Sequence, residues 1–178
     1  MSEETLGNKA RIGAIASRPS EALGQRADSA APIAIAGLAA GAIDVGFNLV
    51  KSINAGTAVL RPWKGVAAAL LGKDAVIHGG DLMAIIGVGL HFVITIGAAA
   101  IYYLVAKRQG WLVRHPFLSG LVFGTIFFLA MNYVILPLSV IGHPLYVGAE
   151  AIAIAVPSHI IMIGLPISLI IGWRLKRA

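Results

Sequence analysis

Each of the four long apolar runs of this 178-residue chain contains one polar side chain that is a candidate for function, and the ionisable ones among these four could bind protons or a ligand. They are Asp44, His91, Asn132 and His159. A charged group inside a bilayer is costly, so an ionisable side chain there needs a partner, water or a functional reason. A carboxylate close to an imidazole can exchange a proton with it. The sequence therefore predicts a polar intramembrane layer in a small membrane protein whose activity it does not identify. A proton-handling or ligand site of Asp44 with His91 or His159, as in a small transporter, is an alternative.

The depths of these residues favour a shared layer. With a rise of about 1.5 Å per residue, Asp44 and Asn132 lie about 9 Å from the outer end of their apolar runs, His91 about 14 Å and His159 about 12 Å. The structural alternative is that the side chains only hydrogen-bond between helices, at about 0.6 kcal/mol each. We expect this role for Asn132 and for Asn48, one turn after Asp44.

The two histidines raise a second hypothesis, haem binding. Their apolar runs cross the membrane in the same direction, so His91 and His159 could approach at similar depth and supply two axial ligands. Gly87, Gly89 and Gly97 would leave room for a flat macrocycle beside His91. The chain has no second histidine pair of this kind. We therefore predict no cofactor and keep haem binding as an alternative.

The other reactive residues form no recognisable catalytic or metal site. Four side chains of ligand type are expected near the outer face: His78, Asp81, His143 and Glu150. They lack the spacing of a metal site. Ser158 and His159 are neighbours on a helix and face apart, so they cannot act as a nucleophile and its base. The chain has no cysteine, which excludes disulfides, thiol catalysis and cysteine-bound metals. We predict a non-enzymatic protein without a metal site.

The elements that must position the polar layer follow from composition. Apolar residues make up 58% of the chain and charged residues only 12%, with a mean hydropathy of +0.85. This is too little charge for a water-soluble domain. Four runs reach the roughly 20 residues that a spanning helix needs. They cover residues 32–50, 82–106, 117–138 and 151–173. The predicted fold is all-α, a polytopic membrane protein with four transmembrane helices over residues 31–178.

Two segments of the chain do not span. Residues 1–30 are polar and of mixed charge, and we expect a mobile tail. Residues 51–81 contain an apolar stretch, 63–71, that is too short to cross a bilayer and is bounded by Pro62 and Gly72. An interfacial helix or a re-entrant segment fits best there.

Glycine and proline residues suggest how the spans pack. Two glycine pairs with a spacing of four offer small faces to other helices: Gly37 with Gly41, and Gly120 with Gly124. We expect these faces to pack within the bundle rather than between copies of the chain. Pro157 and Pro166 interrupt the last span, where each removes a backbone hydrogen bond. A kink without a transport role is the expected result.

The basic residues predict orientation. Of the 14 lysines and arginines, ten lie in the tail, in the loop at 107–116 and at the C-terminus, and four lie within 51–81. The positive-inside rule therefore places both termini in the cytoplasm. These residues are scattered at helix ends, so the net charge of +6 does not indicate a nucleic-acid partner. The expected surroundings are the lipid bilayer, with a homo-oligomer or a larger membrane complex left open.

Several short motifs resemble the YagU-like family of bacterial inner-membrane proteins. They are the run from Gly89-Leu90-His91-Phe92 to Ala106, the run from Gly120 through Gly124 to Pro137-Leu138, and the late span with His159 and an arginine-rich end. The resemblance covers most of 33–178. It implies a multi-span inner-membrane protein without an established activity, and it supplies no catalytic residue.

Overall fold

The structure is a computed structural model that describes residues 30–177. All regular elements in this part of the chain are helical. Four helices are long and apolar enough to cross a membrane: Ala30–Asn54, Leu82–Arg108, Pro116–Leu138 and Ala149–Leu175. The predicted all-α, four-helix membrane fold is thereby confirmed. Each helix extends slightly beyond its predicted span, because helical structure continues into the polar residues that flank an apolar run. The predicted tail lies outside the described residues, except that Ala30 begins the first helix.

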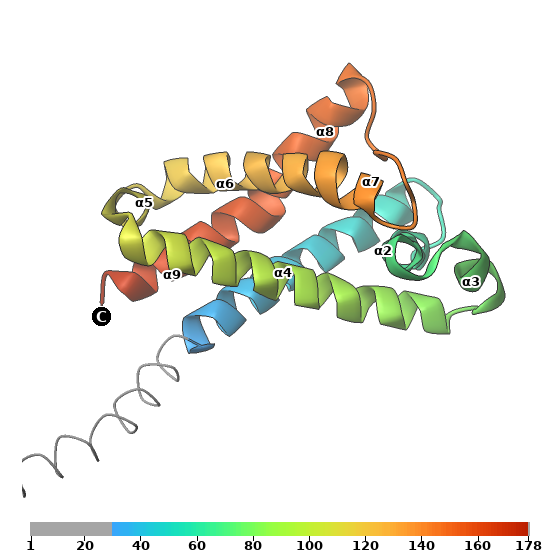
Figure 1. Ribbon diagram of the computed structural model, residues 1–178, viewed down its shortest axis with the longest axis horizontal. Coiled ribbons are helices and arrows are strands. Elements are labelled where there is room, and N and C mark those ends of the chain that lie inside the picture. The colour runs from blue at the N-terminus through green and yellow to red at the C-terminus, as the bar shows by residue number, and fades with distance from the viewer. Residues whose placement is uncertain (1–29, 178) are drawn as a thin grey trace, which may run out of the picture. The chain divides into compact units, whose positions relative to one another are not determined.

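Residues 33–177 belong to one compact unit. The first spanning helix and α4 (Leu82–Arg108) pack together, and the third span packs on the fourth. The last two spans are each made of three consecutive pieces: α6 (Pro116–Ala130), η1 (Met131–Ile135) and α7 (Leu136–Leu138), then α8 (Ala149–His159), η2 (Ile160–Gly164) and α9 (Leu165–Leu175). Figure 1 shows the short helix α5 (Gly110–Arg114) at the end of the unit where α4 stops.

The predicted interfacial or re-entrant segment contains two short helices, α2 (Arg61–Leu71) and α3 (Lys73–His78). Figure 1 shows both near the start of α4. Pro62 stands in the first turn of α2, where its missing N–H costs nothing, and Gly72 ends the helix with a φ of 86°. Trp63 is buried on the side of α2 that meets α4, whereas Leu70 on another side is exposed. The segment is thus an amphipathic helix laid against the bundle.

Two π-turns, η1 and η2, interrupt the third and fourth spans. Pro137 and Pro166 each lie two residues after one of these turns. A proline cannot donate to the carbonyl four residues earlier and collides with it, and in both spans that carbonyl lies inside the π-turn. The wider turn relieves the conflict. Pro157, the other proline predicted to interrupt the last span, lies inside α8.

The glycine pairs permit close crossings inside the chain. A Cβ atom at Gly37 would lie 2.5 Å from the Ile96 Cα atom of α4. A Cβ at Gly124 would lie 2.6 Å from the Ile160 Cα atom, and one at Gly120 would overlap the Ser168 hydroxyl. Both glycine faces are therefore filled by neighbouring helices of the same chain, as close helix packing in membranes requires.

Candidate intramembrane polar site

Asp44 of the first helix and His91 of α4 meet inside the bundle. The His91 Nε2 atom lies 3.6 Å from the Asp44 Oδ2 atom and 3.3 Å from the Gly41 carbonyl oxygen. Only 9% of His91 is exposed. Both neighbouring oxygens are acceptors, so Nε2 carries a proton and donates to the Gly41 carbonyl. The structure therefore brings together the carboxylate and one imidazole of the predicted polar layer.

Gly41 explains why the two helices come close enough for this contact. A Cβ atom there would lie 2.7 Å from the Phe92 ring and 2.9 Å from the Thr95 hydroxyl oxygen. With hydrogen in place of a side chain, α4 can approach the backbone of the first helix. Asp44 follows Gly41 by three residues and so lies on the same helix face. The local sequence Gly-x-x-Asp thus presents a bare carbonyl and a carboxylate to one histidine.

Aromatic rings enclose the His91 imidazole. The Trp63 ring lies edge-on with its centroid 5.2 Å away, and the Phe92 ring lies 5.8 Å away. Trp63 belongs to α2, whose backbone reaches α4 at Gly87, where a Cβ atom would overlap the Trp63 carbonyl oxygen. Sequence reasoning did not place Trp63 in the site. Its signal was the short apolar stretch within 51–81, which predicted a segment against the bundle but not its register.

His159 approaches the same carboxylate from the fourth span. It interacts electrostatically with Asp44, as does Lys51 further along the first helix. The His159 Nδ1–H donates to the Ala155 carbonyl oxygen at 2.8 Å, and the Phe128 ring lies edge-on at 5.2 Å. Since Nδ1 carries the proton, Nε2 of the neutral ring is an acceptor. His91 therefore donates from Nε2 to the first helix, whereas His159 donates from Nδ1 to its own helix.

Asn132 has a different place from the one expected. Its side chain, 1% exposed, makes three hydrogen bonds to the loop between α7 and α8. Nδ2 donates to the Tyr146 carbonyl oxygen at 2.9 Å, and Oδ1 accepts from the N–H groups of Leu145 at 3.1 Å and Tyr146 at 3.0 Å. The amide fixes a loop and does not join two helices. Asn48 donates to the Asp44 backbone carbonyl at 2.9 Å, within its own helix.

The fixed loop carries a residue that sequence reasoning missed. Burial raises the pKa of the Tyr146 phenol, and the negative charge of Asp44 raises it further. Tyr146 therefore lies within electrostatic range of the carboxylate, although Asp44 belongs to the first helix and Tyr146 to the loop after the third span. No periodicity could indicate this, because the position depends on how the loop folds back over the third span. We call Asp44, His91, His159 and Tyr146 the polar site.

The polar site fits acid–base chemistry better than metal or haem ligation. A haem iron needs the lone pair of an imidazole nitrogen, but the His91 Nε2 faces two oxygen acceptors as a donor. Gly87, one of the glycines expected to leave room for the macrocycle, is covered by the Trp63 backbone. Within residues 30–177, no three histidine, aspartate or glutamate side chains gather as metal ligands. What the site offers is a carboxylate, two imidazoles and a phenol with different proton affinities.

Comparison with known proteins adds no relative to this picture: no family model, curated protein or solved structure matches the chain. The resemblance to the YagU-like family therefore stays a prediction. The site is interpreted from its own geometry.

Proposed function

We propose that this integral membrane protein is not an enzyme but a proton-handling protein, which binds and releases protons at the Asp44–His91 pair and couples this to the movement of protons or a solute. The observation that carries the proposal is the 3.6 Å contact between the carboxylate and the imidazole, made by two spanning helices in a largely buried place. Ionisable side chains inside spanning helices mark proton relays and substrate paths in many transporters.

The surroundings of the pair support a change of protonation rather than a fixed charge. Asp44 interacts electrostatically with His91, His159 and Lys51, which lie on three different helices. Two of these groups are imidazoles, a side chain that can serve both as proton donor and as proton acceptor. A proton that arrives at one member of the site alters the interactions of the others. Such mutual dependence is what proton coupling requires.

Tyr146 supplies a link between the site and the loop side of the bundle. Its side chain is 37% exposed, yet its phenol interacts electrostatically with Asp44. The three hydrogen bonds of Asn132 hold the Tyr146 backbone in place. A partly exposed hydroxyl near the carboxylate can pass a proton between the surface and the interior. The proposed entry therefore lies at the loop 139–148.

The proposal also includes location. We place the protein in a bacterial inner membrane with both termini in the cytoplasm, which is supported by ten of the 14 basic residues lying on the side of the termini. The loop 139–148 and the polar site would then face the outer half of the membrane.

Proton flux into liposomes tests the function directly. Purified protein is reconstituted with an internal pH-sensitive dye, and a pH gradient is imposed in the presence of a potassium ionophore. We expect flux above that of protein-free vesicles, and Asp44→Asn should reduce it to the protein-free level. Glu150→Gln is the matched control, since it removes one exposed carboxylate at the start of α8 and should leave the flux unchanged. Equal flux from the wild type and Asp44→Asn would contradict the proposal, provided that both variants show the same helical content.

A further inference from the structure

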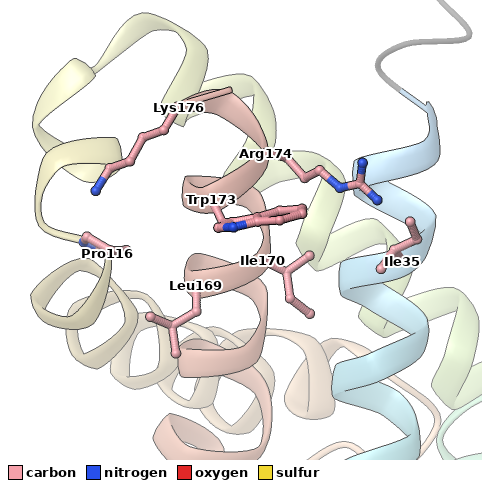
Figure 2. Close-up of a pocket in the computed structure, with 7 residues that line it drawn as sticks. All are labelled: Ile35, Pro116, Leu169, Ile170, Trp173, Arg174 and Lys176. Carbon is pink, nitrogen blue, oxygen red and sulfur yellow. The ribbon is translucent and has the colours of Figure 1, made fainter. Parts of the chain in front are cut away.

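An apolar groove lies between the first helix and α9, closer to the ends of the span-forming segments at the chain termini than Asp44 and His159 are. Its walls include Ile35 of the first helix and Leu169 and Ile170 of α9, and its volume is about 580 Å³. This volume is in the range of small-ligand sites. Figure 2 shows Leu169 and Ile170 below Trp173, whose ring points toward the first helix and Ile35.

The rim of the groove is cationic. Arg174 and Lys176 line it, and Figure 2 shows them on either side of Trp173, with Arg174 toward the first helix. No acidic residue lines the groove, and the ion pairs found within residues 30–177 involve neither cation. The Arg177 guanidinium lies over the Trp173 ring, 3.9 Å from its centroid. An apolar wall below two cations without a carboxylate partner in the described residues is complementary to an amphipathic anion.

The position of the groove along the span identifies the anion. The last spanning helix ends at Leu175, so Arg174 and Lys176 stand where a membrane-spanning helix leaves the hydrocarbon. Trp173 belongs to the residue type that prefers this boundary. Leu169 and Ile170, one turn earlier, lie at the depth of lipid acyl chains. The molecules whose phosphate and acyl chain have this same arrangement are phospholipids.

We propose that the groove binds an anionic phospholipid, with its head group at the cationic rim that Arg174 and Lys176 form and an acyl chain along Leu169 and Ile170. Basic pockets between spanning helices recognise anionic head groups through such contacts. The proposal does not depend on the proton site, because it rests on another set of residues. It adds a ligand class and a second site to the protein.

Native mass spectrometry of the full chain in detergent tests this binding. The protein is titrated with phosphatidylglycerol and, separately, with phosphatidylcholine of the same acyl chains. We expect one phosphatidylglycerol molecule to be retained at lipid concentrations at which phosphatidylcholine is lost. The double variant Arg174→Gln/Lys176→Gln should weaken the retained lipid about 30-fold, which corresponds to about 2 kcal/mol for two cations near a lipid phosphate.

Two further variants make the result specific. Lys107→Gln/Arg108→Gln removes the same charge from the end of α4 but leaves the groove intact, so it should keep the bound lipid. Leu169→Trp keeps both cations and fills the groove from an exposed position, so it should displace the lipid. A circular dichroism spectrum of each variant verifies the fold.

Two outcomes would overturn the proposal. The first is equal retention of the two lipids by the wild type, or equal loss of phosphatidylglycerol in both double variants, since the positive charge would then act without a site. The second is displacement of the lipid by millimolar inorganic phosphate, since the cations would then hold a free phosphate and the groove would contribute nothing. Persistence of the lipid in phosphate, together with its loss in Leu169→Trp, supports the proposal.

Discussion

The two ends of the helical bundle bury different kinds of side chain. Toward the chain termini, small and branched apolar residues form a continuous core that includes Ala36, Ala99, Ile167 and Ile171, each fully buried. Toward the loops, the same helices enclose the carboxylate and imidazoles of the polar site. A short helix and a loop, rather than further spanning helices, cover this second end.

Their polar groups show the difference most clearly. In the apolar core, the Tyr102 hydroxyl meets the Ser119 hydroxyl at 2.7 Å, and Ser119 lies within reach of backbone carbonyls as well. These groups are uncharged and fully paired. At the other end, an aspartate and a histidine are in contact, and both side chains are ionisable. One end of the bundle is thus built for stability, and the other retains ionisable groups which stability alone would not favour.

The largest predicted effect on stability comes from displacing α2, the helix that covers the polar end. In Gly87→Ala, the new methyl group overlaps the Trp63 carbonyl oxygen, and neither backbone can yield without moving α2. We expect the free energy of unfolding to fall by about 3 kcal/mol, measured by titration with SDS in mixed micelles. Gly89→Ala, on the same helix with open space around the new atom, should change it by less than about 1 kcal/mol. Equal effects of the two substitutions would show that α2 does not pack on α4 as described.

A smaller loss of stability is expected when the loop 139–148 is released from the side chain of Asn132. Asn132→Leu keeps the volume but removes all three hydrogen bonds to the loop, which leaves the N–H groups of Leu145 and Tyr146 without partners. At about 0.6 kcal/mol per bond, unfolding becomes easier by about 2 kcal/mol. Asn48→Leu removes a single bond within one helix and should cost no more than about 0.6 kcal/mol. Faster amide hydrogen exchange in 139–148 should accompany the first substitution only; unchanged exchange there would contradict the role of Asn132.

A substitution in the apolar core should lower the stability only slightly and leave the function unchanged. Tyr102→Phe deletes the hydroxyl that meets Ser119, whose own hydroxyl keeps the Pro116 carbonyl at 3.0 Å as a partner. We expect a loss of about 0.6 kcal/mol in the same SDS titration. Proton flux in liposomes should equal that of the wild type. A loss of flux in this variant would remove the distinction between the two ends.

The smallest effect is a pH dependence at the loop. The folded protein raises the pKa of Tyr146, whereas the unfolded chain releases the phenolic proton at an ordinary value of about 10. The stabilisation by the neutral phenol is therefore complete below about pH 10 and is lost as the pH rises further. The ultraviolet difference between the wild type and Tyr146→Phe isolates this titration. The pKa of the phenol should shift toward its ordinary value in Asp44→Asn but not in Glu150→Gln. Identical titrations in the wild type and both variants would place Tyr146 away from Asp44.

The apolar architecture was predictable because it depends on the length and composition of continuous segments. A histidine partner for Asp44 was predictable for a related reason: a regular rise per residue converts sequence distance into depth. Depth did not distinguish His91 from His159, and the structure places His91 in contact with Asp44. Glycine spacing indicated close crossings, and the crossing at Gly41 is what brings His91 to the first helix.

The remaining features depend on contacts that are distant in sequence and on irregular backbone. The depth argument assigned Asn132 to the bundle, but a loop that folds back captures its amide. Trp63 and Tyr146 come from segments outside the spans, whose register no hydrophobic period determines. The π-turns before Pro137 and Pro166 change the helix phase locally, so facing directions beyond them cannot be read from a period of 3.6 residues.

Infrared difference spectroscopy of the protein in membranes tests the central claim most directly, because it observes protonation of a single carboxyl group. Acidification of the wild type should produce the carbonyl band of a protonated carboxylic acid. This band should be missing in Asp44→Asn, shifted in His91→Gln and retained in Glu150→Gln. A spectrum of Asp44→Asn that superimposes on that of the wild type would show that Asp44 takes up no proton, and the proposed proton-handling function would be wrong.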